Sequence, residues 1–164
     1  MTNEMALKLF EIEKYTIETQ YILPKHLENL TIVAKSFDDE NNFAIHINRK
    51  SLEIQKVGLS LNSTITLRRV DFFGGHNNPT EILLYPDNDR LLELMERYKG
   101  FRFSRQSHIH VYIDGYEEKW AFPLSEFGIS DNANIQVQAR LFFHYCNIIN
   151  NPQLNYGDIT DVVN

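Results

Sequence analysis

The sequence predicts an α+β fold in which a curled antiparallel β-sheet of five or more strands is flanked by three helices. Three segments carry apolar residues at helical spacing, and several segments between them alternate apolar and polar residues with the period of a strand. The segments between the helices leave little room for the crossovers of a parallel sheet. A small jelly-roll holding a metal through a His-x-His pair is the alternative fold, and the three predicted helices weaken it.

The first helix is predicted at the N-terminus, within a helical region of residues 1–24. Over residues 4–20, Leu9, Ile12 and Ile17 form one apolar stripe, and Pro24 ends any helical continuation.

A second helix is predicted over residues 88–99, capped by Asn88 and stopped by Gly100. A third is predicted over residues 135–149, where Cys146 falls on the apolar face and is expected to be a small buried hydrophobe.

The strands are predicted between these helices. Two short strands, 30–37 and 43–48, surround a polar turn, and residues 63–72 form a third strand rich in β-branched and aliphatic residues. Residues 107–122 form a hairpin around Asp114-Gly115, a strong two-residue turn signal.

Length and composition predict one domain spanning residues 1–164, with a loose tail over 152–164. A single cysteine fits a reducing compartment, and the acidic N-terminus and the lack of a long apolar run favour a cytoplasmic protein with no membrane contact. The net charge of −6 argues against a general nucleic-acid coat but leaves a local basic site open.

Polar residues gather on one face of the predicted hairpin. A two-residue turn places Ile109 opposite Trp120 on a core face. It places His108, His110 and Tyr112 on the other, more polar face. The residues expected opposite these three are Ala121, Lys119 and Glu117, in that order.

Two further segments are expected near this row. Arg69 and Asp71 extend one face of strand 63–72 and are expected to pair, either structurally or as part of a site. The loop Gly74–Pro79 contains two glycines that permit positive φ, and it brings His76 toward the hairpin.

These residues predict metal-independent chemistry on RNA or a nucleotide, with no cofactor. His108 and His110 would exchange protons, supported by His76, and Arg69 would stabilise phosphate charge. The residues expected to bind substrate are Tyr112, Lys119, Asp71 and Asn78.

Three alternatives remain open. His76, His108 and His110 could hold a zinc-like ion, the surface could bind a host protein without catalysis, or the polar row could be structural.

The order of several short motifs resembles a family of small uncharacterised bacterial proteins, often carried on prophages and other mobile elements. The motifs are Arg69-Val-Asp71, Gly75-His76-Asn77-Asn78-Pro79, His108-Ile-His110-Val-Tyr112, Gly115-Tyr116, Trp120-Ala121 and Tyr145-Cys146-Asn147-Ile148. The resemblance implies a mobile-element accessory protein that acts on nucleic acid or on a host defence component. A fainter similarity exists to small toxins of toxin–antitoxin pairs.

Overall fold

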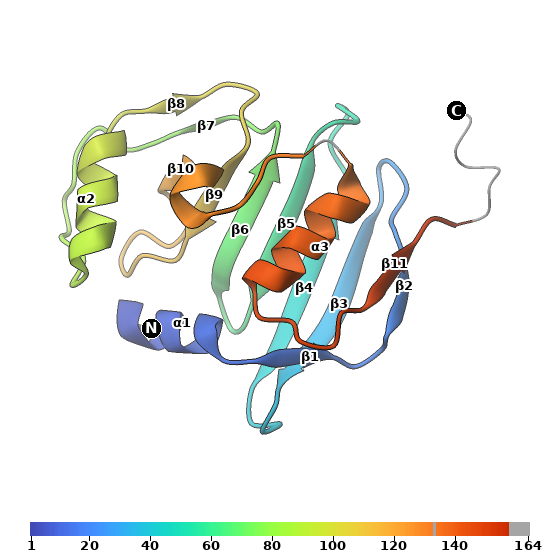
Figure 1. The fold of residues 1–164 in the computed structure, drawn as a ribbon. Helices are drawn as coiled ribbons and strands as arrows, with labels where there is room; N and C mark the ends of the chain where they lie inside the picture. Colours follow the sequence, from blue (N-terminus) through green and yellow to red (C-terminus); the bar gives the residue numbers. More distant parts are fainter. Residues whose placement is uncertain (133, 158–164) are drawn as a thin grey trace.

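The computed structural model describes residues 1–132 and 134–157, and Figure 1 shows their arrangement. The helices are α1 (Asn3–Glu11), α2 (Asp89–Tyr98), α3 (Ile135–Tyr145) and the short 3-10 helix η1 (Leu124–Phe127). The strands are β1 (Lys14–Thr16), β2 (Gln20–Ile22), β3 (Asn29–Ser36), β4 (Asn42–Asn48), β5 (Val57–Asn62), β6 (Thr66–Phe72), β7 (His76–Asn77), β8 (Arg102–Phe103), β9 (His108–Val111), β10 (Ala121–Pro123) and β11 (Gln153–Asn155).

Seven of the strands form one open sheet in the order β1-β3-β4-β5-β6-β9-β10, and every neighbouring pair in it is antiparallel. Two small two-stranded sheets, β11-β2 and β7-β8, lie beside it, and β11 pairs with β2 in parallel. The predicted α+β class with a mostly antiparallel sheet is therefore confirmed.

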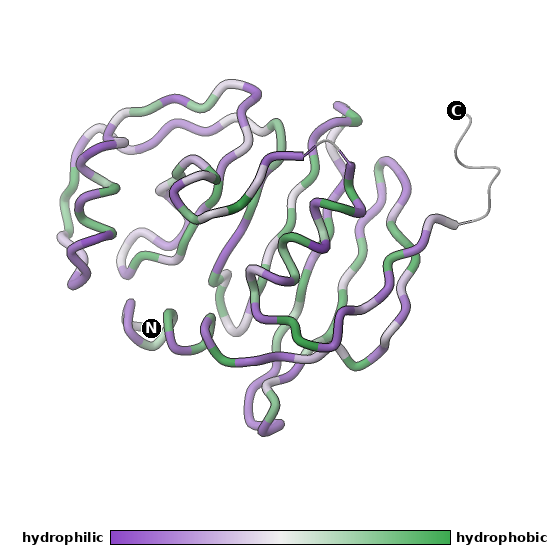
Figure 2. The backbone as a smooth tube through the Cα atoms, in the orientation of Figure 1, coloured by the Kyte–Doolittle hydropathy of each residue, from purple (hydrophilic) through white to green (hydrophobic). Residues whose placement is uncertain are grey.

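The sheet buries one face beneath helices α1 and α3, as the ribbon shows (Figure 1). Alternation produces this face, since Phe43, Ile45 and Ile47 of β4 are buried while the residues between them are partly exposed. Hydrophobic and hydrophilic residues also alternate along the turns of α2 and α3 (Figure 2). Both helices therefore turn an apolar stripe inward.

The middle and C-terminal helices match the prediction closely. The Asn88 side chain accepts the backbone N–H of Leu91 at the start of α2, and Gly100 beyond its end has a φ of 67°. Helix α3 ends at Tyr145, four residues earlier than expected, and Cys146 behind it is buried.

The N-terminal helix was predicted too long. Helix α1 ends at Glu11, and strands β1 and β2 occupy much of the expected remainder. Lys14 explains the break, because its backbone pairs with Ser36 of β3 while its buried ammonium donates to the carbonyls of Phe10 and Ile12. The same ammonium donates to the carbonyl of Cys146 and so ties the C-terminal ends of α1 and α3 together.

Three other elements differ from expectation. Residues 153–155 of the predicted loose tail form β11, whose Leu154 is fully buried, whereas residues 158–164 lie outside the described residues. Strand β5 was not predicted. Strand β6 begins at Thr66 instead of Ser63, and its pairing with β5 shifts at Leu61/Asn62. No helix among the described residues is long and apolar enough to cross a membrane.

Candidate functional site

The pairing of β6 with β9 assembles the centre of the candidate site. In this antiparallel register Asp71 lies opposite His108, and Arg69 lies opposite His110. Directly opposed residues on one face of a sheet have Cβ atoms only about 5 Å apart, so the four side chains meet on the side facing away from α1 and α3.

The hairpin that carries the histidines is shifted from its predicted register. His110 faces Ala121 rather than Lys119, and His108 faces Pro123 rather than Ala121. The connection is longer than a two-residue turn, since β9 ends at Val111 and β10 begins at Ala121. Gly115 and Glu117 within it both have positive φ. A shift by two residues keeps His108 and His110 together on one face, whereas Tyr112, beyond the end of β9, lines the opposite side of the sheet.

The face of the hairpin that carries His108 and His110 is buried. His108 is fully buried and His110 is 3% exposed, because the segment that carries β7 and β8 covers them. The ring of Phe103 in β8 lies 4.8 Å from that of His108, centroid to centroid.

Both imidazole rings are fixed by main-chain carbonyls. Nδ1 of His108 lies 2.8 Å from the carbonyl oxygen of Gln106, and Nδ1 of His110 lies 2.7 Å from that of Glu118. A carbonyl oxygen can only accept, so each Nδ1 carries a proton. In a neutral ring Nε2 then presents its lone pair, whereas in a protonated ring it presents a second N–H to the carboxylate of Asp71.

These two Nε2 atoms point to one carboxylate oxygen. Oδ2 of Asp71 lies 3.6 Å from Nε2 of His108 and 3.5 Å from Nε2 of His110. Both separations exceed the roughly 2.7–3.2 Å of an N–H···O hydrogen bond. They are near the ~3.4 Å ligand–ligand edge of a tetrahedron with metal bonds of about 2.0–2.1 Å.

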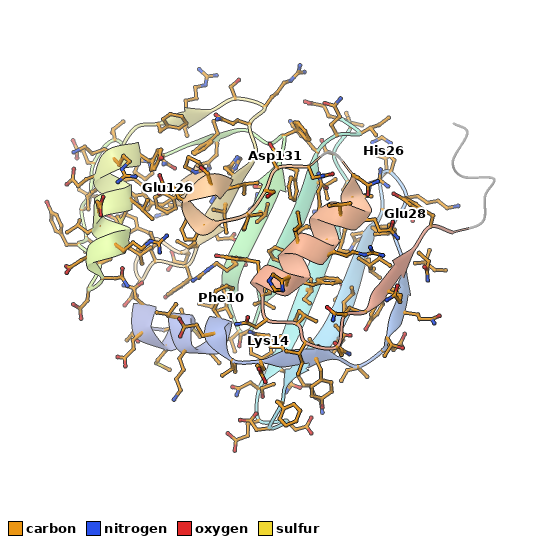
Figure 3. All side chains as sticks on the ribbon, viewed as in Figure 1. Phe10, Lys14, His26, Glu28, Glu126 and Asp131 are labelled. Carbon is orange, nitrogen blue, oxygen red and sulfur yellow. The ribbon has the colours of Figure 1, made fainter. Side chains whose placement is uncertain are left out.

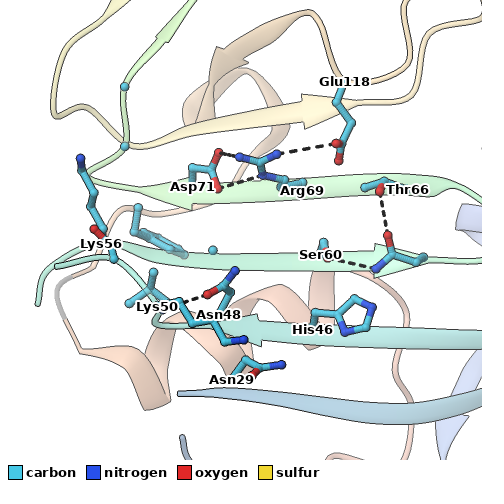
Figure 4. A pocket seen from close by; sticks show the side chains of 17 residues that line it. Asn29, His46, Asn48, Lys50, Lys56, Ser60, Thr66, Arg69, Asp71 and Glu118 are labelled. Atoms are coloured by element: carbon cyan, nitrogen blue, oxygen red, sulfur yellow. Dashed lines mark hydrogen bonds and ion pairs between the residues drawn. The ribbon is translucent and has the colours of Figure 1, made fainter. Parts of the chain in front are cut away.

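Arg69 holds the carboxylate in place from its other side. Its Nε and Nη2 donate to Oδ1 and Oδ2 of Asp71 at 3.0 and 2.7 Å, and its Nη1 lies 3.6 Å from Oε2 of Glu118. Figure 4 shows this chain of three charged groups. Burial alone would raise the pKa of Asp71, but the two histidines and Arg69 outweigh it and hold that pKa well below its usual range.

Two glycines make room for this cluster. A Cβ on Gly74 would lie 3.0 Å from Cβ of Asp71 and 3.1 Å from Cε1 of His108, and one on Gly58 would lie 3.3 Å from Oδ1 of Asp71. The Gly74-Gly75 pair permits positive φ, but neither glycine adopts it. Gly74 is needed for close approach.

His76 reaches the other histidines, as expected. Its ring centroid lies 4.7 Å from that of His110 and 5.9 Å from that of His108, and its Nε2 lies 3.0 Å from the carbonyl oxygen of Lys119. Desolvation and the neighbouring His110 lower the pKa of His76. His76 is partly exposed and stands at the edge of the cluster.

The remaining predicted site residues lie in different surroundings. The Asn78 amide is buried and bonded to main-chain groups of Tyr98 and Ala121, so it has a structural role. The hydroxyl of Tyr112 donates to the carbonyl of Met1, away from the histidines. The exposed side chain of Lys119 lies on the rim.

Two hollows give access to the cluster. A trough of about 770 Å³ crosses the open face of β4, β5 and β6, and it is lined mainly by amides, hydroxyls and two lysines (Figure 4). A smaller hollow of about 410 Å³ lies against His76, His110 and Lys119. Arg69 and Asp71 line both.

Sequence reasoning did not find Glu118 or the carbonyl of Gln106 as parts of the site. Neither had a recognisable signal, because the role of Glu118 depends on the hairpin register and that of Gln106 depends on its main chain. Gly74 was noticed for the wrong physical reason.

A comparison with known protein families gives a match. The model of a family described as a family of unknown function, DUF6978, matches residues 1–148. No curated protein and no solved structure gives a significant match. The expected kinship with uncharacterised proteins is thereby confirmed, whereas the mobile-element and toxin–antitoxin contexts stay predictions.

Proposed function

The chain belongs to the family of unknown function DUF6978, so its function must be inferred from its own site, and we propose that it binds a divalent transition-metal ion. The ligands are Oδ2 of Asp71, Nε2 of His108 and Nε2 of His110. Their ligand atoms all lie within 4.8 Å of one another. Two imidazoles and one carboxylate suit ions of the zinc, cobalt and manganese class.

One observation carries the proposal. Nε2 of His108 is buried and has no hydrogen-bond partner among the described residues, although a buried polar nitrogen without one costs about 1–3 kcal/mol. In the neutral ring its lone pair faces the carboxylate of Asp71. A metal ion between these atoms would satisfy both groups.

The surroundings resemble those of known metal ligands. Metal-binding histidines usually donate their second N–H to a carbonyl or a carboxylate, and ligating carboxylates are themselves hydrogen-bonded. The carbonyls of Gln106 and Glu118 and the guanidinium of Arg69 supply these contacts here. This support is complete before any ion binds.

The ligand set differs from the one first considered, because Asp71 replaces His76. His76 already uses Nε2 on the carbonyl of Lys119 and stands at the open edge. Burial also argues against His108 and His110 as a free acid and base, since a substrate proton must come within hydrogen-bond reach.

The smaller hollow beside the proposed metal ligands favours hydrolysis of a phosphoester, as in RNA or a nucleotide. A bound ion of this class can lower the pKa of a coordinated water to about 7 and supply a hydroxide nucleophile. The smaller hollow places His76 and Lys119 beside His110, where they can contact the substrate. Arg69, partly exposed, holds Asp71 rather than the phosphate. Binding to a host protein stays a prediction.

Metal binding is tested on chelator-treated protein. Titration with Zn²⁺ or Co²⁺ should saturate at one ion per chain, and Co²⁺ should give the visible absorption of a low-coordinate site. His108→Gln and His110→Gln should each weaken binding by more than about 100-fold, beyond the 10–100-fold effect of changes around the ligands. His144→Gln, which changes an exposed histidine of α3, is the matched control.

Each result has a defined meaning. Equal loss in His144→Gln, or unchanged affinity in folded His108→Gln and His110→Gln, would refute the site. Phosphoester hydrolysis is tested with bis(4-nitrophenyl) phosphate and a short RNA. Metal binding without hydrolysis of either substrate would leave the metal site standing and reject the enzymatic part.

A further inference from the structure

A third cavity lies on the opposite face of the sheet from the histidines. It measures about 530 Å³ and is enclosed by α1, α2, η1, α3 and the adjoining parts of β6 and β9. Phe10 and Glu126, both labelled in Figure 3, belong to two of the elements that line it. This volume lies within the roughly 300–1,000 Å³ of small-molecule sites.

The walls of the cavity are mostly apolar. They come from the inward side of α1, from α2, from η1 and from two tyrosines. The apolar and aromatic lining residues are Ala6, Leu7, Phe10, Leu91, Leu94, Val111, Tyr112, Phe127 and Tyr145. Such a surface favours an aliphatic or aromatic body.

One buried cation lines this cavity without a counter-charge. Arg68 is 8% exposed, and no carboxylate of the described residues pairs with its guanidinium. Its Nε donates to the hydroxyl of Tyr145, its Nη1 donates to the carbonyl of Leu67, and its guanidinium carbon stacks 4.1 Å from the ring centroid of Phe10. A guanidinium has five N–H donors, so donors remain for a ligand.

The acidic residues of the lining do not neutralise Arg68. Oε1 of Glu126 accepts from Nη1 of Arg97 and from the hydroxyl of Tyr98, and Glu11 is exposed. Arg90, at the rim, donates to the carbonyl of Glu126 and stacks on Phe127. The cavity therefore has a cation at depth and a second one at its rim.

An unpaired buried charge is expensive, and buried arginines are normally paired. We propose that the cavity is a binding site for a small monocarboxylate with an aliphatic or aromatic body, whose carboxylate pairs with Arg68. The planar guanidinium suits a carboxylate because its N–H bonds form a fork that matches the two oxygens. This site is independent of the proposed metal site, since Arg68 and Arg69 point to opposite faces of β6.

The test uses hexanoate and phenylacetate as probes, with hexanamide and phenylacetamide as neutral partners of the same shape. Calorimetric titration of the intact chain should give one site for each carboxylate, with each amide binding at least about tenfold more weakly. Cross-peaks of α1 and η1 should shift in the ¹H–¹⁵N spectrum. Arg68→Met should abolish the preference for the carboxylate.

The matched control is Arg102→Met, which removes the same charge from an exposed side chain of β8 and should bind the probes as the wild type does. Arg68→Met should fold, since it removes an unpaired buried charge, and its thermal stability without ligand should not fall. If it fails to fold, Arg68→Lys keeps the charge but not the fork, and it should bind carboxylates more weakly than the wild type while still preferring them to amides.

Three results would overturn the proposal. They are the absence of saturable carboxylate binding at millimolar concentrations, equal affinity for acids and amides, and equal loss of binding in Arg68→Met and Arg102→Met. Failure here would leave the metal site untouched, because none of the proposed metal ligands lines this cavity.

Discussion

Replacing Gly74 by alanine tests whether close approach shapes the candidate metal site. The added Cβ would lie 3.0 Å from Cβ of Asp71 and 3.1 Å from Cε1 of His108. Carbon atoms normally approach to about 3.5–4.0 Å, so both side chains must move by several tenths of an ångström. Cε1 lies between the two ring nitrogens, and its displacement therefore moves the Nε2 atom that faces Asp71.

The expected magnitude follows from two opposing effects. Overpacking of a filled interior costs about 1–3 kcal/mol. Replacing glycine also removes freedom from the unfolded chain, which returns about 0.4–1 kcal/mol. Gly74→Ala should therefore lower the free energy of unfolding by about 1–2 kcal/mol, and metal affinity should fall by about tenfold.

The neighbouring glycine provides the control. A Cβ on Gly75 would lie 3.6 Å from the carbonyl oxygen of Phe103, an ordinary contact, and Gly75 is exposed. Gly75→Ala should therefore leave stability within about 1 kcal/mol of the wild type. Urea denaturation measures both variants, followed by Co²⁺ titration. Equal stability and equal metal affinity of the two variants would refute the role assigned to Gly74.

Three further predictions concern the groups that support the fold and the site. Lys14→Met should destabilise by about 3 kcal/mol or more, because it leaves three main-chain carbonyls without their donor. Burial lowers the pKa of Lys14 to about 8, so between pH 8 and pH 10.5 the folded chain has released this proton while the unfolded chain still binds it. The free energy of unfolding of the wild type should therefore rise relative to that of Lys14→Met over this pH range, as measured by urea denaturation. A difference that becomes smaller as the pH rises would contradict this sign. Asn78→Ala should lower the free energy of unfolding by about 3 kcal/mol in the same assay, since it removes three hydrogen bonds to the main chain. A decrease below about 0.5 kcal/mol would show that these bonds are replaceable. In a double-mutant cycle, Arg69→Ala and Asp71→Ala should be coupled by about 0.5–3 kcal/mol, and simple additivity would mean that the two side chains do not interact in solution.

Local sequence patterns determined much of the framework. Alternation predicted β3 and β4. The capping residue Asn88 and the glycine Gly100 predicted the two ends of α2. Alternation also placed His108 and His110 on one face of their strand, and it placed Arg69 and Asp71 on one face of theirs. These features depend on neighbours in the chain, so a sequence alone can specify them.

Tertiary contacts determined what those residues can do. Whether Asp71 meets His108 depends on the pairing of two strands separated by 35 residues or more, and no local pattern sets that register. Phe103 then buries a face that alternation alone would leave open to solvent. Tertiary contacts also decide where α1 ends. The helical pattern of the sequence continues past Lys14, but the ammonium of Lys14 donates to the carbonyl of Cys146 beyond the end of α3, and its backbone pairs with β3. The sequence by itself therefore specified which side chains share a face of each strand. Only the tertiary structure brought Asp71, His108 and His110 together and removed the two histidines from water.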